Sequence, residues 1–569
     1  MLETDGRIMS LESIKRRFSS RLVLRIAIVF QIAILFAVYF SARTSFVWIW
    51  VIVSFIPATI IAVTNVEKRY VLASLLILFV SQQAVFIFSH PTWGYDYLSD
   101  SVNDLQLASI ISENGHFALG QTGYIRQSYS YYPFLHIFSV ALSKASGLSL
   151  VFIALYTIPI LNALLTSIFL YSLNFELFGL QDRERNLATL LFGASYFYTY
   201  FQSQFVRETF AFPIVLLTLL SAAKVIRHSS RKYWLLLPIL FITVVLSHHI
   251  SSYVLLVILA IISASFNLIH NSARPNNRLG RTLLLLVATL ASYVSFVVIE
   301  QFTQQIITSF DALGNIFQKA ASAGAPPLAL YDPLRVYSAY SHYGIIGALV
   351  LVGGVGLLLK IRRGQSPVTP GISLATFLVA AFLVCMALRF SSSLGSWGYY
   401  MALRGTIWAF IGISFVMAEG IARVFKLNSL QPSVSISYKK LLAILLIVCV
   451  IAAGKFSQYP FVISAPLTES PVTHSRYVAS SWLKEVTRHG DYLLVAPETN
   501  DSKAFESARE MAAYAYLNEY SLDWMAYSKF KGYIPFVGKF FEQFQNRSNI
   551  NIIYDNGETN LGYRFLPQE

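Results

Sequence analysis

Apolar runs of about 20 residues recur along most of this chain, and they restrict its fold more than any other feature. A helix of that length is about 30 Å long, which matches the hydrocarbon core of a bilayer. Only 13% of the 569 residues are charged, whereas soluble domains have about 25% charged residues. The sequence therefore predicts an all-α polytopic membrane protein and excludes a soluble globular one.

The distribution of charge indicates how the chain crosses the membrane. A net charge of +14 would suit nucleic-acid binding, but the basic residues cluster in short loops between apolar runs, as the positive-inside rule describes. We therefore expect membrane lipids as partners and no nucleic acid. The basic patch from Lys15 to Arg25 is followed by no small-residue cleavage site, which predicts a retained first helix and a cytoplasmic N-terminus. Cys385 and Cys449 lie within apolar runs, so no disulfide framework is expected.

The predicted topology depends on whether the apolar segment 132–146 crosses the membrane. If it crosses, three later basic clusters lie outside, and if it does not, all three lie inside: Arg183/Arg185, Arg227/Arg231/Lys232 and Arg274/Arg278/Arg281. The positive-inside rule favours the second arrangement. The segment is also short, begins with Tyr-Tyr-Pro, and contains His136 and Lys144. We predict a juxtamembrane or re-entrant helix here.

The remaining apolar runs predict about 13 spans. They cover residues 22–42, 45–64, 70–89, 149–172, 187–204, 208–226, 233–248, 250–269, 283–301, 343–360, 371–390, 404–424 and 439–458. The chain then divides into a membrane domain, 1–458, with external loops 90–148 and 302–342, and an external C-terminal domain, 459–569.

The C-terminal domain is polar and aromatic, with helical stretches such as SRYVASSWLKEV and a strand-like DYLLVAP, so we predict a small α/β domain or cap. It contains two N-glycosylation sequons, at Asn500 and Asn546, which an external location permits. The chain contains no Walker or Rossmann motif, which argues against an ATP-driven pump.

Ionisable residues gather at the predicted external ends of the spans. Such residues cost several kcal/mol in or near apolar spans by some scales and are usually paired or functional. Their convergence predicts a polar cavity open to the external side, lined by Arg207, Glu208, His248, His249, Glu300, Arg389 and Arg404. Each also has a simpler explanation: an arginine that snorkels or pairs with its neighbour, an interfacial histidine, or an ordinary helix end.

The first external loop contains the amphipathic stretch SDSVNDLQLASIISENGHF, residues 99–117. Asn103 is suited to an N-cap and Gly115 to a helix end, so Asp104 is expected in the first helical turn. Asp104 is the candidate general base, and Asp100 is the reserve candidate or a metal or hydrogen-bond partner. The alternative is a solvated helix whose aspartate stabilises the helix dipole. We expect the side chains of Glu113 and His116 to face solvent or to lie at the rim of the site.

Three stretches of this region follow in order: NDLQLASIISENGHF, YSYYPFLHIFSVAL and SGLSLVFIALYTI. The order of an aspartate-bearing external helix, a Tyr-x-Tyr-x-Pro-x-x-His segment and a long span resembles the GT-C superfamily. These integral-membrane glycosyltransferases use polyprenyl-phosphate sugars and include protein O-mannosyltransferases and lipid A aminoarabinose transferases. The resemblance implies a GT-C-like fold with a catalytic aspartate in the first large external loop, which matches Asp104 by position, with Asp100 second.

With this resemblance, we expect inverting transfer of a sugar from an outer-leaflet polyprenyl-phosphate donor to an external protein, lipid or glycan acceptor. Asp104 is then the base, and the leaving phosphate is neutralised by arginines, which suit phosphate oxygens. The candidates are Arg207, Arg389 and Arg404, with Glu208, His248, His249 and Glu300 lining the cavity. A divalent cation is possible, but the sequence contains no clear second carboxylate of a DxD pair, so metal dependence is open.

The chain departs from some members of this superfamily. Its C-terminal domain contains no Trp-Trp-Asp-Tyr-Gly-like motif, and only a rearranged form occurs at 93–97, which disfavours oligosaccharide transfer to asparagine. Two alternatives remain open. A surface-polysaccharide polymerase or ligase is expected to have an arginine-rich external loop, whereas the basic residues of 302–342 are only Lys319 and Arg335. A lipid-glycan transporter would favour inverted repeats and mid-membrane charges.

Overall fold

The computed structural model of the chain describes a helical bundle and parts of the segments around it. The described residues are 11–41, 47–64, 67–89, 99–118, 130–195, 198–199, 202–228, 231–269, 277–299, 333–362, 370–390, 395–427, 437–456, 492–493, 515–516, 550–555 and 560–564.

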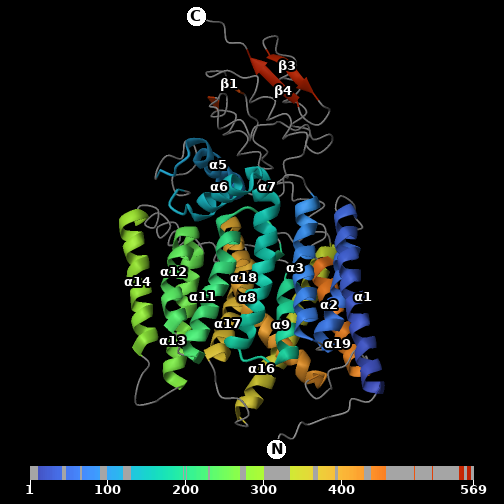
Figure 1. Cartoon of the computed structure of the whole chain (residues 1–569). Helices are drawn as coiled ribbons and strands as arrows, with labels where there is room; N and C mark the ends of the chain where they lie inside the picture. Colours follow the sequence, from blue (N-terminus) through green and yellow to red (C-terminus); the bar gives the residue numbers. More distant parts are fainter. Residues whose placement is uncertain are drawn as a thin grey trace, which may run out of the picture.

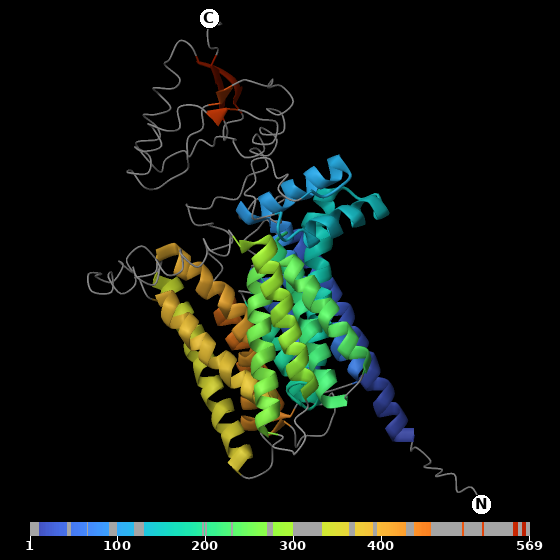
Figure 2. The ribbon, with the colours of Figure 1, turned by 90° about the vertical axis from the view of Figure 1, so that its left-hand side faces the viewer.

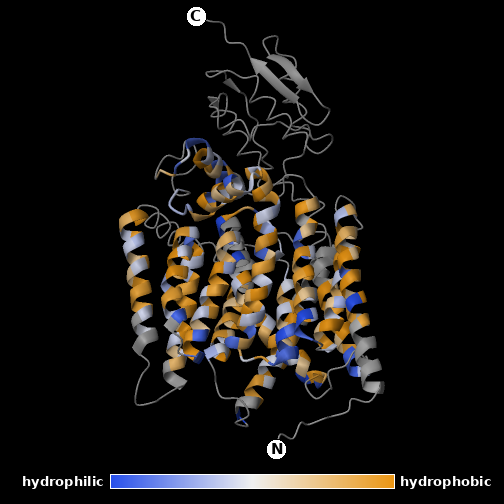
Figure 3. Cartoon of the chain, viewed as in Figure 1, coloured by the Kyte–Doolittle hydropathy of each residue, from blue (hydrophilic) through white to orange (hydrophobic). Residues whose placement is uncertain are grey.

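The bundle helices run side by side and consist mostly of hydrophobic residues (Figures 1 and 3). Leu351, Leu284 and Phe296 are 71%, 74% and 88% exposed, as expected for side chains that face lipid. The helices are α1 (Leu11–Ser41), α2 (Val47–Thr64), α3 (Lys68–Ser89), α8 (Ile158–Glu176), α9 (Asp182–Gly193), α11 (Arg207–His228), α12 (Arg231–Ser247), α13 (His249–Ile269), α14 (Asn277–Val297), α16 (Pro333–Arg362), α17 (Pro370–Phe390), α18 (Gly395–Val424) and α19 (Tyr438–Phe456).

Five stretches of the described residues are long and apolar enough to cross a membrane. They are Leu24–Ser41, Leu150–Glu176, Arg207–His228, His249–Phe266 and Arg404–Val424. Further apolar helices are shorter, with 10–17 residues in their apolar parts. The predicted class, a helical protein with several helices able to span a membrane, is therefore confirmed, and the number of 13 spans stays a prediction.

One predicted span, 187–204, is wrong as a single helix. Helix α9 ends at Gly193, Ser195 is not helical, and a turn at 203–206 precedes α11. Residues 198–199 and 202 are helical again, and a buried side chain supplies hydrogen bonds to Gln202, just before the turn. The Asn162 amide donates to the carbonyl oxygen of Gln202 at 3.1 Å and to its side-chain oxygen at 3.0 Å. Non-helical backbone inside a membrane protein needs such internal partners.

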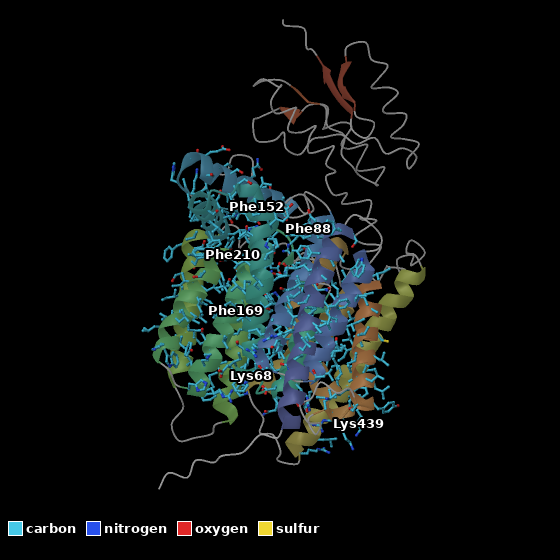
Figure 4. The ribbon with its side chains drawn as sticks, turned by 45° about the vertical axis from the view of Figure 1, so that its right-hand side comes forward. Lys68, Phe88, Phe152, Phe169, Phe210 and Lys439 are labelled. Carbon is cyan, nitrogen blue, oxygen red and sulfur yellow. The ribbon has the colours of Figure 1, made fainter. Side chains whose placement is uncertain are left out.

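Helices α5 (Ser99–Asn114) and α6 (Phe134–Ser146) lie across one end of the bundle (Figures 1 and 2). The 13 residues of α6 span only about 20 Å, which is too short to cross. Phe152 lies at this end, whereas Lys68 and Lys439 lie toward the opposite end (Figure 4).

An ion pair supports the prediction that 132–146 does not cross. Lys68, at the start of α3, lies 3.9 Å from Asp182, at the start of α9. Two elements run the length of the bundle between these residues: α3, and the continuous stretch formed by α7 (Leu150–Phe152), the π-helix η2 (Ile153–Thr157) and α8. An even number of crossings returns the chain to the same end, so α6 adds none. Which end is cytoplasmic stays a prediction.

The predicted start of α5 is wrong. The helix begins at Ser99, so Asn103 is inside it and Asp104 lies in the second turn. The predicted end is confirmed: Gly115 has φ of +72° and its N–H donates to the Ile111 carbonyl at 3.0 Å. Leu107 is buried with Ile111 against α6, as expected for an amphipathic helix.

The C-terminal region contains four described strands. β1 (Tyr492–Leu493) pairs with β2 (Ala515–Tyr516), and β3 (Ile550–Asp555) pairs with β4 (Asn560–Arg564), both antiparallel. β1 falls within the strand-like DYLLVAP, whereas the expected helices of this domain and both sequons lie outside the described residues. Helix α16 begins at Pro333, within the predicted loop 302–342, and the apolar part of the helix is Ile346–Leu359; the external location of this loop stays a prediction.

Candidate functional site

Asp104 is a buried carboxylate at the junction of α5, α6 and α11. Its side chain is 1% exposed. Oδ1 accepts a hydrogen bond from Nε2 of His136 at 2.9 Å and lies 3.0 Å from Nε of Arg207. Oδ2 accepts the backbone N–H of Arg207 at 3.3 Å. The aspartate therefore contacts one positive charge and two neutral donors, which makes its burial as an anion energetically acceptable.

The contact with the backbone of Arg207 explains part of this position. Arg207 is the first residue of α11, and the first N–H groups of a helix have no partner within it. A carboxylate there satisfies a free donor and interacts favourably with the positive end of the helix dipole. Asp104 thus caps α11 from a helix that lies about 100 positions earlier in the sequence.

His136 is the second member of this group. Its side chain is 0% exposed, and Nδ1 has no hydrogen-bond partner among the residues that the structure describes. Burial lowers the pKa of His136, and the charge of Arg207 lowers it further, while the contact with Asp104 opposes both effects. The ring is therefore neutral at physiological pH, with its proton on the Nε2 that donates to Asp104.

A second ion pair lies next to the first. Glu208 follows Arg207 in the first turn of α11, and its Oε2 lies 3.5 Å from Nε of Arg404 on α18. The Arg404 side chain is 21% exposed, whereas that of Glu208 is 4% exposed. Two acids and two arginines from α5, α11 and α18 are thus arranged as two neutral pairs.

His248 and His249 join the group at the turn between α12 and α13. Ser251 donates its backbone N–H to Nδ1 of His248 at 3.3 Å, so the proton of the neutral ring is on Nε2. His248 is buried, and its ring lies 5.0 Å from that of His249. The ring of His249 lies 5.1 Å from that of Tyr132, which in turn lies 5.9 Å from the guanidinium of Arg207.

Six of the nine predicted site residues are thus brought together: Asp104, Arg207, Glu208, His248, His249 and Arg404. Asp100 lies one turn before Asp104 on α5, and Arg389 lies at the end of α17, but both side chains are outside the described part of the chain. Glu300 is also outside it. The cavity and the roles of these residues stay predictions.

His136 was assigned no role from the sequence alone. A signal was present, because the segment containing it was already expected at the same face as Asp104. A histidine in an apolar juxtamembrane helix also needs a polar partner when it is buried. The described residues contain no group of three or more His, Cys, Asp or Glu side chains suited to holding a metal ion.

No protein-family model matches the chain, and no curated protein matches it.

Proposed function

We propose that the protein is an inverting glycosyltransferase that moves a sugar from an outer-leaflet polyprenyl phosphate to an external protein, lipid or glycan. The observation that favours this function is the paired group of charges around Asp104 and Arg404 at one end of an apolar bundle. A lipid-linked donor would present its phosphate at that level, where the chain offers arginines beside carboxylates. The resemblance to GT-C enzymes in the first external loop points to the same chemistry.

Asp104 is the proposed base. An ionised carboxylate offers about four lone-pair positions, and the described residues contact Oδ1 twice and Oδ2 once. One position on Oδ2 is left for the acceptor hydroxyl. The acceptor oxygen forms a bond to the anomeric carbon from the side opposite the phosphate, and its proton goes to Oδ2. The carbon–phosphate oxygen bond breaks, and the leaving phosphate keeps the electron pair.

Arg404 is the leading candidate for the leaving phosphate. Its side chain is 21% exposed, compared with 10% for Arg207, and its ion pair with Glu208 is long, at 3.5 Å. Charge stabilisation of this kind usually supplies the largest part of the barrier reduction in group transfer. Arg207 is paired with Asp104, so its charge would act on the phosphate from a greater distance. Arg389 is the third candidate.

A binding experiment tests the donor class with the product common to all such donors. Undecaprenyl phosphate and dolichyl phosphate should bind the purified protein in nanodiscs, as measured by native mass spectrometry. Arg404→Gln should weaken binding about tenfold, by loss of one charge-assisted contact. Equal binding of the phosphate and of the free polyprenol would contradict a phosphate site.

A transfer experiment tests the reaction. The protein is incubated with polyprenyl-phosphate hexoses and pentoses and with peptide, lipid and glycan acceptors, with Mg²⁺ or Mn²⁺ and with a chelator. Mass spectrometry follows the glycosylated product and the released polyprenyl phosphate. Asp104→Asn should abolish transfer, whereas Glu113→Gln, at an exposed carboxylate of the same helix, should retain it. Full activity of Asp104→Asn would exclude Asp104 as the base. Translocation of the lipid-linked sugar without release of polyprenyl phosphate would exclude this function.

A further inference from the structure

We infer that His136 is a positioning residue for Asp104, holding one carboxylate oxygen as a neutral donor so that the other oxygen faces the acceptor. This inference rests on the proposed function, because it names the residue that prepares the proposed base.

The position of His136 is fixed from several sides. Helix α6 packs on α11 through the ring of Phe210, which lies 5.8 Å from that of Phe134 and 5.1 Å from that of Phe138. Leu135, next to His136, is 0% exposed in a small apolar cluster with Phe205. The imidazole therefore has little freedom to move, and the 2.9 Å contact to Oδ1 of Asp104 is its one hydrogen bond among the described residues.

The electrostatics explain why a neutral donor suits this place. The charged groups that act on the ring are Asp104 from α5 and Arg207 from α11. These two already neutralise each other, so a protonated His136 would add an unbalanced positive charge to a buried site. A neutral imidazole instead donates a hydrogen bond to the carboxylate and adds no charge. Hydrogen bonds to the ionised form favour that form.

These contacts determine which oxygen of Asp104 faces the acceptor. Arg207 and His136 both act on Oδ1, while among the described residues Oδ2 contacts the backbone N–H of Arg207 alone. The carboxylate is thereby turned so that its less occupied oxygen can receive the acceptor proton. Loss of the histidine donor would allow rotation of the carboxylate and make its ionised form less stable.

Two variants separate this role from simple packing. His136→Phe keeps a ring of similar size but has no donor, and His136→Gln restores an N–H donor. In the transfer assay, His136→Phe should lower kcat about 10- to 100-fold, because that factor corresponds to the contribution of one hydrogen bond to a charged group. The acidic limb of its pH–rate profile should move to higher pH, KM should change little, and His136→Gln should restore most of the profile. His116→Phe, at an exposed histidine beyond α5, is the control.

The outcomes distinguish the two proposals. A wild-type protein that transfers no sugar overturns the proposed function, and the positioning role with it. An active wild type with an unchanged His136→Phe rate and profile overturns the positioning role alone. An active wild type in which both variants lose activity equally, with no shift of the profile, also overturns it, because that pattern indicates packing.

Discussion

Replacing Arg207 with methionine leaves the Asp104 carboxylate buried without the cation that balances it. The two groups lie 3.0 Å apart, and at an effective dielectric constant of about 20 they attract by about 5–6 kcal/mol before desolvation is subtracted. Breaking a buried ion pair by removal of one partner costs about 3–5 kcal/mol. We therefore expect Arg207→Met to lower the free energy of unfolding by about 3–5 kcal/mol, while the methionine preserves much of the packing volume.

The assay is unfolding by denaturant in mixed detergent micelles, with the double variant Asp104→Asn/Arg207→Met as a companion. The double variant should be less destabilised than Arg207→Met alone, because a neutral asparagine needs no cation. Arg69→Met is the matched control: Arg69 lies 2.8 Å from Glu67, but their side chains are 63% and 41% exposed. Exposed pairs contribute about 0–1 kcal/mol. Equal losses for Arg207→Met and Arg69→Met would refute the argument, since burial would then not determine the strength of the pair.

Two further predictions concern helix packing and pH. A Cβ added at Gly353 would lie 2.0 Å from the carbonyl oxygen of Val416 on α18, whereas one at Gly354 would meet nothing within 4 Å. Gly353→Ala should therefore lower the free energy of unfolding by about 1–3 kcal/mol, and Gly354→Ala should leave it unchanged or raise it by up to about 1 kcal/mol. Denaturant unfolding measures both, and the reverse order would contradict the packing of α16 on α18. Burial holds the pKa of His136 below its ordinary value, so below about pH 6.5 the unfolded chain binds a proton that the folded chain does not. Stability should fall as the pH is lowered from about 6.5, and His136→Phe should show a smaller fall; an identical pH dependence would show that the folded protein accepts this proton.

The helices that span the bundle could be predicted from the sequence because their signal is local. An apolar run such as 208–226 needs no knowledge of its neighbours, and α11 matches it within a few residues. The position of α6 followed from charge, since the basic clusters on either side fix the parity of the crossings. The prediction of a single span at 187–204 was wrong for the opposite reason. Its hydropathy is that of a span, but a buried amide, that of Asn162, supports an interruption of the helix that hydropathy does not report.

The pairing within the site was harder to predict. The sequence placed Asp104, Arg207 and Arg404 at one face but gave no partners, and the nearest acid to Arg207 in the chain is its neighbour Glu208. The structure instead pairs Arg207 with Asp104 and Glu208 with Arg404. Such partners depend on how α5 and α18 are placed around the first turn of α11, and no sequence pattern within these segments reports that placement.

Asp104 has a structural and a proposed chemical role, and the two must be separated before any loss of activity is interpreted. Its contact with the first N–H of α11 and its ion pair with Arg207 stabilise the fold whether or not the protein is an enzyme. Asparagine keeps a carbonyl oxygen for one of these contacts, so Asp104→Asn should remove proton transfer while it retains part of the cap. Alanine would remove both. A transfer rate that falls equally in Asp104→Asn and Asp104→Ala, while only the alanine variant loses substantial unfolding free energy, would therefore assign the lost activity to the missing base.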